Sequence, residues 1–314
     1  MISEAKILDV KAQLSVLLNL PKEEKESKIS SVFDVSLSSA RRYIRLAEAY
    51  DDPPEAPKIL LLDIETSPLE VYAWGIGSKV SLGHYQIKHE WFIISWAAKW
   101  LLADGVFGDC VTPKEALSKD DDRICHSLWD CIEEAHIVVA HNAKSFDVRK
   151  INARFIANGL SPPSSYQVVD TLLHSRKIAA FSSHKLDHLT QTFGLSQKDS
   201  TDFSLWVRCC NGDKEALDYM YKYNKSDIRA LEGLYLYLRP WMSSHPSMGL
   251  YCDHVGSVCP HCMSESLDWS INPYYTPAGK FSAFRCKKCG AIGRSRFSTM
   301  APGRNRNLVV STAR

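Results

Sequence analysis

Two acidic residues, Asp63 and Glu65, directly follow an apolar run in the stretch KILLLDIETSP at residues 58–68. The run is typical of a buried strand, and side chains two residues apart on a strand point to the same face. The two carboxylates would repel each other unless a cation lies between them, and carboxylate oxygens are preferred ligands of Mg²⁺ and Mn²⁺. A strand that simply runs into a charged turn also explains the pair, so a metal site requires further acids.

Further acids occur in two later stretches. Asp147 begins a helical pattern after the apolar run HIVVAHN. Asn142 at the end of that run can satisfy backbone groups of the intervening loop, and it is also a predicted nucleic-acid contact. Asp227 lies in a long amphipathic stretch, with Tyr223 four residues earlier and therefore on the same helical face. A phenol at that spacing can orient a water for attack on phosphorus. Each feature also has a structural explanation, because acids favour the first turn of a helix and tyrosines on amphipathic helices usually pack.

Taken in order, these stretches resemble the motifs of the DEDD 3′-5′ exonucleases, a family of the RNase H-like fold that includes the proofreading domains of DNA polymerases. The matching residues are Asp63-Ile64-Glu65, then Asn142 to Phe146-Asp147, then Tyr223-x3-Asp227. Family members that use histidine place it five residues before the last aspartate. That position is Lys222 here, so the Tyr subtype (DEDDy) fits. The resemblance covers about residues 58–241.

The resemblance implies a role for each of these residues. Asp63 would bridge two divalent ions, Mg²⁺ or Mn²⁺. Glu65 and Asp227 would complete the site of the first ion, and Asp147 would hold the second. Tyr223 would orient the nucleophilic water. The implied reaction is hydrolysis of the terminal phosphodiester of a nucleic acid by a two-metal-ion mechanism.

Four of the ten cysteines predict a second kind of metal site. They form two CxxC pairs with 23 residues between them, which is the arrangement of a zinc ribbon holding one structural Zn²⁺. Gly290 follows the second pair and allows a left-handed turn there. The predicted ligands are Cys259, Cys262, Cys286 and Cys289.

Other side chains of this module could also bind the zinc ion. Cys252, His254 or His261 could replace one cysteine, and a redox-active CxxC pair is a different interpretation. Basic residues surround the second pair, and they favour phosphate contacts without sequence choice; a protein-docking module is the alternative. The residues predicted to bind nucleic acid here are Arg285, Lys287, Lys288, Arg294 and Arg296.

The N-terminal segment predicts a helix-turn-helix. Two helical patterns flank a turn that begins at Asp34, where glycine is frequent, and Ser36 can cap the second helix. The apolar residues Ala40, Ile44 and Ala47 are expected to pack inward. Small helical domains of this pattern also occur without DNA contacts. The residues predicted to face a duplex are Ser38, Ser39, Arg41, Arg42 and Arg45.

Composition divides the 314 residues into four parts. They are a helix-turn-helix-like domain at 1–50, a proline-rich linker at 51–57, an RNase H-like exonuclease domain at 58–241, and a zinc ribbon with a basic tail at 242–314. The predicted fold class of the large domain is α/β, with a mixed five-stranded sheet flanked by helices. No apolar stretch reaches the roughly 20 residues that span a bilayer, and the N-terminus does not resemble a signal peptide. We therefore expect a cytoplasmic protein with no membrane partner.

The sequence therefore predicts a metal-dependent 3′-5′ exonuclease whose substrate is nucleic acid, with DNA as the expected polymer. The layout resembles nucleases encoded by bacteriophages, which would place the protein in the host cytoplasm. Replication or transcription proteins are candidate partners, and the oligomeric state stays open. Two other functions compete with this prediction. One is a structure-selective endonuclease or RNA-trimming enzyme on the same fold, and the other is a non-catalytic DNA-binding or transcription-associated adaptor.

Overall fold

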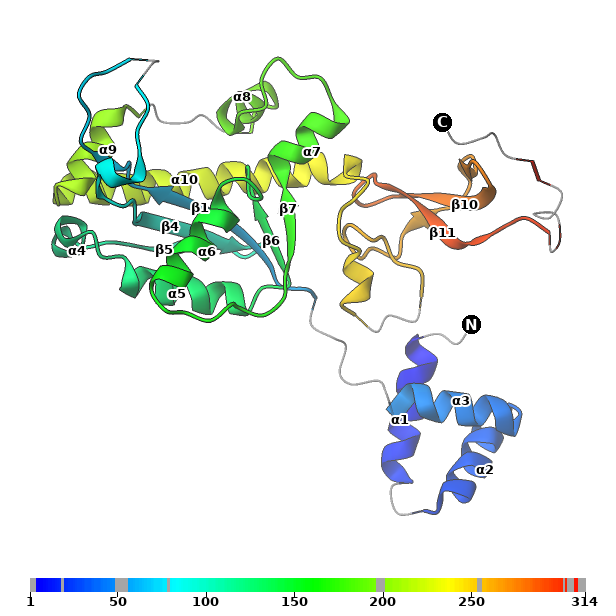
Figure 1. Cartoon of the computed structure of the whole chain (residues 1–314). Coiled ribbons are helices and arrows are strands. Elements are labelled where there is room, and N and C mark those ends of the chain that lie inside the picture. The colour runs from blue at the N-terminus through cyan, green and yellow to red at the C-terminus, as the bar shows by residue number, and fades with distance from the viewer. Residues whose placement is uncertain are drawn as a thin grey trace. The chain divides into compact units, whose positions relative to one another are not determined.

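The structure is a computed structural model that describes residues 4–17, 20–48, 56–77, 80–195, 201–252, 256–301, 303 and 308–309 (Figure 1). The chain divides into two compact units. One unit is Lys58–Ser244, an α/β fold. The other comprises Met1–Pro57 and His245–Arg314, and it contains an N-terminal group of helices and a C-terminal ribbon, each with its own apolar core. Within the described residues, no helix combines the length and apolar character needed to cross a membrane.

The α/β unit is built on a mixed five-stranded sheet of order β5-β4-β1-β6-β7. β1 pairs antiparallel with β4 and parallel with β6, while β4–β5 is antiparallel and β6–β7 is parallel. The carboxyl ends of β1, β6 and β7 therefore meet at one edge of the sheet. This arrangement confirms the predicted α/β fold class with a mixed five-stranded sheet. The strands are β1 (Ile59–Thr66), β4 (Ile93–Trp100), β5 (Phe107–Cys110), β6 (Ile137–Ala140) and β7 (Gln167–Asp170).

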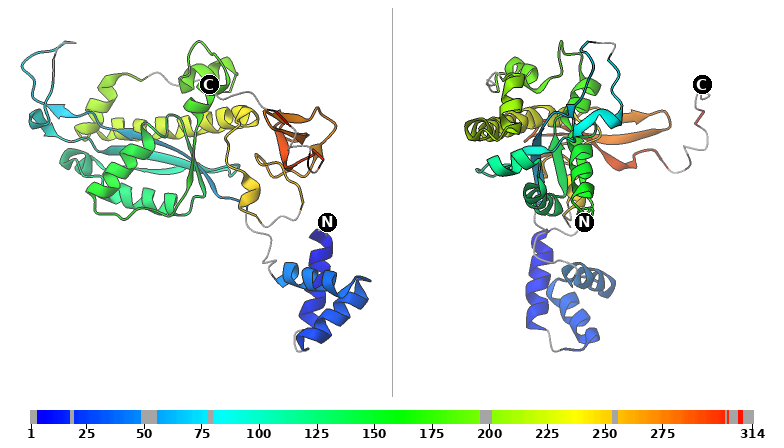
Figure 2. Two further views of the ribbon diagram at one scale, coloured as in Figure 1. Left: turned by 45° about the vertical axis from the view of Figure 1, so that its right-hand side comes forward. Right: turned by 60° about the vertical axis from the view of Figure 1, so that its left-hand side comes forward.

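Helices cover both faces of this sheet. Figures 1 and 2 show the long helix α10 on one face and α5 and α6 on the other. Aspartates cap three of the helices, since Asp170, Asp202 and Asp213 accept backbone N–H bonds at the starts of α7, α9 and α10. The helices are α4 (Pro113–Ser118), α5 (Asp122–Glu133), α6 (Asp147–Ala157), α7 (Thr171–Ile178), α8 (Leu186–Thr192), α9 (Phe203–Cys210) and α10 (Lys214–Leu238).

One face of β1 packs on α5. Leu60, Leu62 and Ile64 alternate along the strand and are all buried in the main core. Trp96, which lies opposite Ile64 on β4, donates a hydrogen bond from its indole Nε1 to the carbonyl of Ile124 in α5 at 3.0 Å. This face therefore belongs to the core, and Trp96 is a core residue.

The other face of β1 is directed at α10. Lys99, which lies opposite Leu61 on β4, forms a largely buried ion pair with Glu232 of α10. Asp63 and Glu65 share the face of Leu61, because side chains alternate along a strand. The apolar run thus ends with two carboxylates that lie between the sheet and α10.

A buried aspartate ties β4, α5 and α6 together. The side chain of Asp121 is completely buried and accepts two hydrogen bonds from the Arg154 guanidinium, at 2.8 and 2.7 Å. It also accepts from the amide N–H of Ile93 at 2.8 Å and from the side-chain amide of Asn158 at 2.9 Å. These four hydrogen bonds satisfy the buried charge of Asp121. They also fix the position of α6 relative to β4.

Replacing this aspartate should be among the more destabilising substitutions in the α/β unit. Asp121→Ala leaves Arg154 and the Ile93 amide without their partner, and breaking a buried pair costs about 3–5 kcal/mol. Urea unfolding of the two proteins measures the loss. The neighbouring Asp122, which is exposed, provides the matched control, and Asp122→Ala should change the stability by no more than about 0.5 kcal/mol. Equal stabilities of the two variants would contradict the prediction.

The N-terminal part consists of α1 (Glu4–Val16), α2 (Lys22–Val32) and α3 (Leu37–Glu48). Ala40, Ile44 and Ala47 are buried against α1 and α2, as the helical periodicity predicts. The turn between α2 and α3 places Asp34 at φ 49°, the left-handed geometry that an aspartate tolerates. Ser36 follows it, and its hydroxyl accepts a hydrogen bond from the amide of Ser39 at 3.3 Å.

The C-terminal ribbon is a small sheet of order β11-β10-β8, in which β9 also pairs with β10. Its strands are β8 (Leu267–Asp268), β9 (Tyr274–Thr276), β10 (Gly279–Cys286) and β11 (Ile292–Ser298). Its core is formed mainly by cysteines rather than large apolar residues, so the fold needs another source of stability. The remaining short elements are β2 (Glu70–Val71), β3 (Ile87–His89) and the 3₁₀ helices η1 (His84–Gln86), η2 (Arg239–Trp241) and η3 (Met248–Leu250).

Candidate functional site

Three carboxylates converge between β1 and α10. Asp63, Glu65 and Asp227 each offer one oxygen, and these three oxygens lie within 4.8 Å of one another. Asp63 and Glu65 are partly buried, and Asp227 is only 5% exposed. At this separation each pair of negative charges repels by roughly 3 kcal/mol at an effective dielectric constant near 20. A divalent cation would reverse the sign of that interaction, and an all-oxygen donor set suits Mg²⁺ or Mn²⁺.

Asn224 belongs to the same group of side chains, although the sequence patterns did not identify it. It is fully buried on α10, and its Nδ2 donates a hydrogen bond to Oδ2 of Asp63 at 2.6 Å. Asn224 lies three residues before Asp227, so both side chains occupy one helical face. That spacing was the available signal in the sequence. The hydrogen bond fixes the orientation of the Asp63 carboxylate.

Asp147 begins α6 and is buried, with only 2% of its surface exposed. It is not among the three carboxylates that lie within 4.8 Å of one another. Within the described residues neither of its oxygens has a hydrogen bond of regular geometry. Burial raises the pKa of Asp147 well above its ordinary value, while the backbone amides of Asp147 itself and of Ile64 oppose the shift. The negative charge of Asp170 adds to the upward shift of the Asp147 pKa, and the effect of the Ile64 amide indicates that the start of α6 lies near β1.

A second aspartate, Asp170, holds the loop that leads to Asp147. Its carboxylate caps α7 through the amide of Leu173 at 3.1 Å. It also accepts from the amides of Asn142 and Lys144, at 3.2 and 3.0 Å. Asn142 adopts φ 75°, the left-handed conformation that asparagine accepts more readily than most residues. Asp170 is therefore a helix cap, and it also positions the loop between β6 and α6.

The third predicted motif includes Tyr223 as well as Asp227. Tyr223 lies on α10 one turn before Asp227 and is 6% exposed, packed against the main core. The helix therefore presents Tyr223, Asn224 and Asp227 on neighbouring positions of the surface that faces β1.

The donor chemistry fits divalent cations. Three carboxylates converge on one point, and the buried carboxylate of Asp147 has oxygens that the described protein groups leave without regular hydrogen bonds. Burying such charges is costly unless they are paired or coordinate a metal. The residues that could hold the ions are Asp63, Glu65, Asp147 and Asp227.

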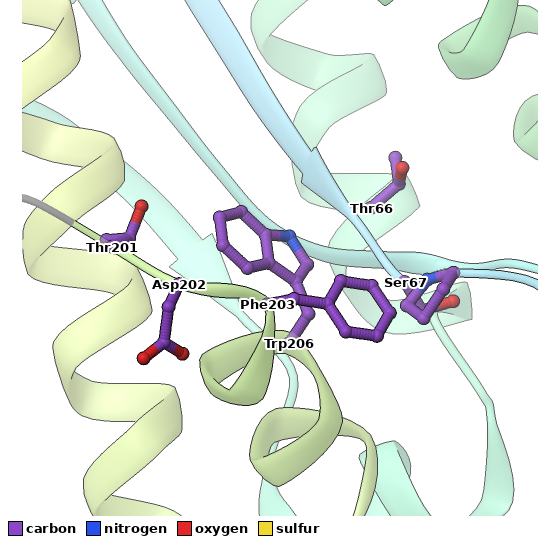
Figure 3. Close-up of a pocket in the computed structure, with 7 residues that line it drawn as sticks. Thr66, Ser67, Thr201, Asp202, Phe203 and Trp206 are labelled. Carbon is purple, nitrogen blue, oxygen red and sulfur yellow. The ribbon is translucent and has the colours of Figure 1, made fainter.

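A cavity of about 430 Å³ lies at the end of β1, and its lining begins at Thr66, the residue after Glu65. One wall is formed by Thr66 and Ser67, which directly follow Glu65, and another by Phe203 and Trp206 of α9. Figure 3 shows the two aromatic rings between α9 and the end of β1. The Phe203 side chain is 67% exposed. The sequence analysis missed this cavity, since α9 is distant from β1 along the chain.

The four predicted zinc ligands also converge. The Sγ atoms of Cys259, Cys262, Cys286 and Cys289 lie within 4.8 Å of one another, and all four are free thiols. The two CxxC turns have the same backbone conformation. Met263 and Gly290, which follow the pairs, have φ of 60° and 81°, and each donates its N–H to the carbonyl of the first cysteine at 2.9 Å. Four thiols directed at one point fit a closed tetrahedral Zn²⁺ site.

The other residues considered as zinc ligands have different surroundings. The Cys252 thiol contacts the sulfur of Met263 at 3.6 Å. The His261 ring packs on the ring of His245 at a centroid distance of 5.0 Å. His254 lies outside the described residues. The cluster of sulfur atoms therefore consists of the two CxxC pairs.

The predicted nucleic-acid contacts lie on surfaces. Arg285, Lys287, Lys288, Arg294 and Arg296 are all exposed on the ribbon. On α3, Ser38 and Arg42 are exposed, while Arg41 forms an ion pair with Glu26 of α2 at 2.8 Å. The side chain of Arg45 lies outside the described part of the structure. No observation tests these residues as nucleic-acid contacts, so they stay predictions.

Comparison with known proteins relates part of the chain to nucleic-acid enzymes. Residues 108–239 match the family model described as RNase_H superfamily. A stretch of 70 residues is 37% identical to the DNA polymerase III PolC-type of Ureaplasma parvum serovar 3, covering 22% of this chain and 5% of that protein. A similar solved structure is the family B DNA polymerase of the archaeon Pyrobaculum calidifontis. It has a TM-score of 0.43 and 16% identity, and the similarity covers 62% of this chain and 27% of that one.

This chain thus matches only a small part of either polymerase. The family match and the observed sheet, with its mixed order and flanking helices, agree with each other. The chain therefore contains a domain of the RNase H-like fold.

Proposed function

We propose that the α/β unit is a metal-dependent 3′-5′ exonuclease that hydrolyses nucleic acid, with DNA as the expected polymer. The observation that carries the proposal is the convergence of Asp63, Glu65 and Asp227; Asp147, buried at the start of α6, is proposed to complete the site. Acids brought together from β1, α6 and α10 have no evident packing role, because they repel one another and lie at the edge of the core. Their chemistry suits phosphodiester hydrolysis assisted by divalent cations.

In this proposal the residues of the site have separate roles. Asp63, Glu65, Asp227 and Asp147 hold Mg²⁺ or Mn²⁺. When bound, these cations stabilise negative charge on the attacking and leaving oxygens of the phosphate. Asn224 keeps Asp63 in the orientation that binding requires. Tyr223 orients the water that attacks phosphorus, and the RNase H-like fold of the domain supports this assignment.

The cavity at the end of β1 supports a substrate with an unpaired end. Phe203 and Trp206 offer aromatic faces beside Thr66, one residue from Glu65. Bases stack on such faces without sequence preference. A terminal nucleotide seated there would place its phosphodiester next to the carboxylates, which is the geometry that an exonuclease needs.

The other two parts of the chain act as accessory modules in this proposal. The ribbon holds one structural Zn²⁺ and contacts phosphates through its exposed basic residues. The N-terminal helices contact duplex DNA through α3, where Ser38 and Arg42 are exposed. Neither module contributes to the group of catalytic acids.

Digestion of a 5′-labelled single-stranded DNA oligonucleotide tests the enzyme assignment. With Mg²⁺ or Mn²⁺ the full-length protein should produce a ladder that shortens from the 3′ end, and EDTA should stop the reaction because the carboxylates alone cannot stabilise the reacting phosphate. An intact oligonucleotide in the presence of both ions would contradict the proposal and favour a non-catalytic adaptor.

Three further substrates separate the exonuclease from its rivals. A 3′-blocked oligonucleotide and a circular single strand should both resist cleavage. Cutting of the circle would identify an endonuclease instead. An RNA oligonucleotide that is shortened faster than DNA would identify an RNA-trimming enzyme.

A further inference from the structure

The ribbon sheet presents two faces of different character. On β10, Phe281, Ala283 and Arg285 point to one face, because side chains alternate along a strand. Their antiparallel partners share that face, and the partners are Tyr274 and Ser298 opposite Phe281, Arg294 opposite Ala283, and Ile292 and Asp268 opposite Arg285. We call this the arginine face. The other face carries Phe284, which is buried and contacts the ring of Trp269 at 4.9 Å.

On the arginine face, one guanidinium lies over two aromatic rings. The Cζ atom of Arg294 is 4.2 Å from the ring centroid of Phe281 and 5.4 Å from that of Tyr274. Arg294 is exposed, and Tyr274 is 49% exposed. These contacts hold a cation beside two π-surfaces on an exposed part of the sheet.

The charge of the ribbon indicates what this face binds. Residues 256–301 contain six lysines and arginines and two acids, Glu265 and Asp268. Asp268 lies opposite Arg285, so it offsets the charge of that residue. On the arginine face itself, Arg294 has no acid opposite it, because its partner in the sheet is Ala283. A cation beside an exposed ring, Tyr274, and a partly buried one, Phe281, is a combination that binds single-stranded nucleic acid, with the cation on phosphate and rings against bases.

We infer that the arginine face is a binding platform for single-stranded nucleic acid, on which bases stack against Tyr274 and Phe281 while Arg294 contacts the backbone. This inference rests on the proposed function, since it supplies that nuclease with a second contact to the same polymer. It differs from duplex binding through phosphates alone, because base stacking requires unpaired bases.

Fluorescence anisotropy with full-length protein tests the inference. The protein carries Asp63→Asn and Asp227→Asn so that the probe, a 5′-fluorescein dT20 oligonucleotide, stays intact. Tyr274→Ala and Phe281→Leu should each weaken binding by roughly tenfold, since each removes one stacking surface. Arg294→Ala should weaken binding. It should also reduce the magnitude of the slope of log K against log salt concentration by about one, since one phosphate contact is lost. An rU20 probe compares RNA with DNA, and a 20-base-pair duplex should bind less tightly than either strand.

Tyr275→Ala is the matched control. Tyr275 is the next residue of β9, it is 63% exposed, and it lies opposite Lys280 on the other face. Its removal should leave the affinity for dT20 unchanged, and all variants should contain one zinc per chain. If Tyr275→Ala weakens binding as much as Tyr274→Ala, or if none of the variants does, the inference is wrong.

The nuclease assay separates this inference from the proposed function. With the catalytic acids intact, Tyr275→Ala, which leaves the arginine face unchanged, should shorten an oligonucleotide at the rate of the unsubstituted protein. A protein that binds dT20 through this face but never cleaves an oligonucleotide would support the binding platform and contradict the proposed nuclease activity.

Discussion

Asp63→Asn and Asp227→Asn should each lower the rate of oligonucleotide cleavage by about 10³-fold or more. Each carboxylate supplies part of the negative charge that holds the cations, and cation binding contributes several kcal/mol of stabilisation to the transition state. An amide keeps the shape of the side chain but not its charge, so the fold should persist. Single-turnover cleavage of a 5′-labelled strand in Mg²⁺ measures the rate, and thermal unfolding checks the fold.

Binding and a control substitution complete this test. Both variants should bind the oligonucleotide nearly as well as the unsubstituted protein, because the loss lies in the chemical step. Asp218 is exposed and lies on the same helix as Asp227, so Asp218→Asn should leave the cleavage rate unchanged. Full activity in both active-site variants would overturn the assignment of the site.

Removal of zinc should unfold the ribbon. Four thiols form most of its core, and in zinc-finger peptides the apparent free energy of metal binding is about 10–16 kcal/mol, which is folding free energy. We therefore expect the purified chain to contain one zinc and Cys286→Ser to contain little or none. Limited proteolysis should then cut the variant within residues 245–314, while the α/β unit stays intact.

Cys252→Ser is the control for the zinc prediction. Cys252 contacts Met263 rather than the cluster of four sulfur atoms, so this variant should retain its zinc and its resistance to protease. Zinc loss in Cys252→Ser together with retention in Cys286→Ser would show that the ligand set is different.

The motifs that depend on neighbouring residues could be predicted from the sequence. The position of Asp63 and Glu65 on one face follows from the alternation of a strand, and the left-handed turn at Gly290 follows from the glycine after the second CxxC pair. The cap at Asp170 is likewise local, since it involves the amide of Leu173. Each of these features involves only a few neighbouring residues in a strand, a turn or a helix cap, so a short sequence pattern is enough to predict it.

Features that depend on distant contacts could not be predicted. Asn224 has a helical spacing from Asp227, but its bond to Asp63 exists only because α10 packs on β1. Asp170 also accepts bonds from Asn142 and Lys144, which the pairing of β6 with β7 brings beside it.

The sequence by itself determined the α/β class, the order of the acidic motifs and the two cysteine pairs, because each depends on the spacing of residues that are close together in the chain. Only the tertiary structure decided which groups meet. It brought Asn224 to Asp63, put Phe203 and Trp206 beside Thr66, and set Arg294 over Phe281. The physical reason is that sheet register and helix packing are settled by burial summed over the whole core, so they bring together side chains whose separation along the chain carries no signal.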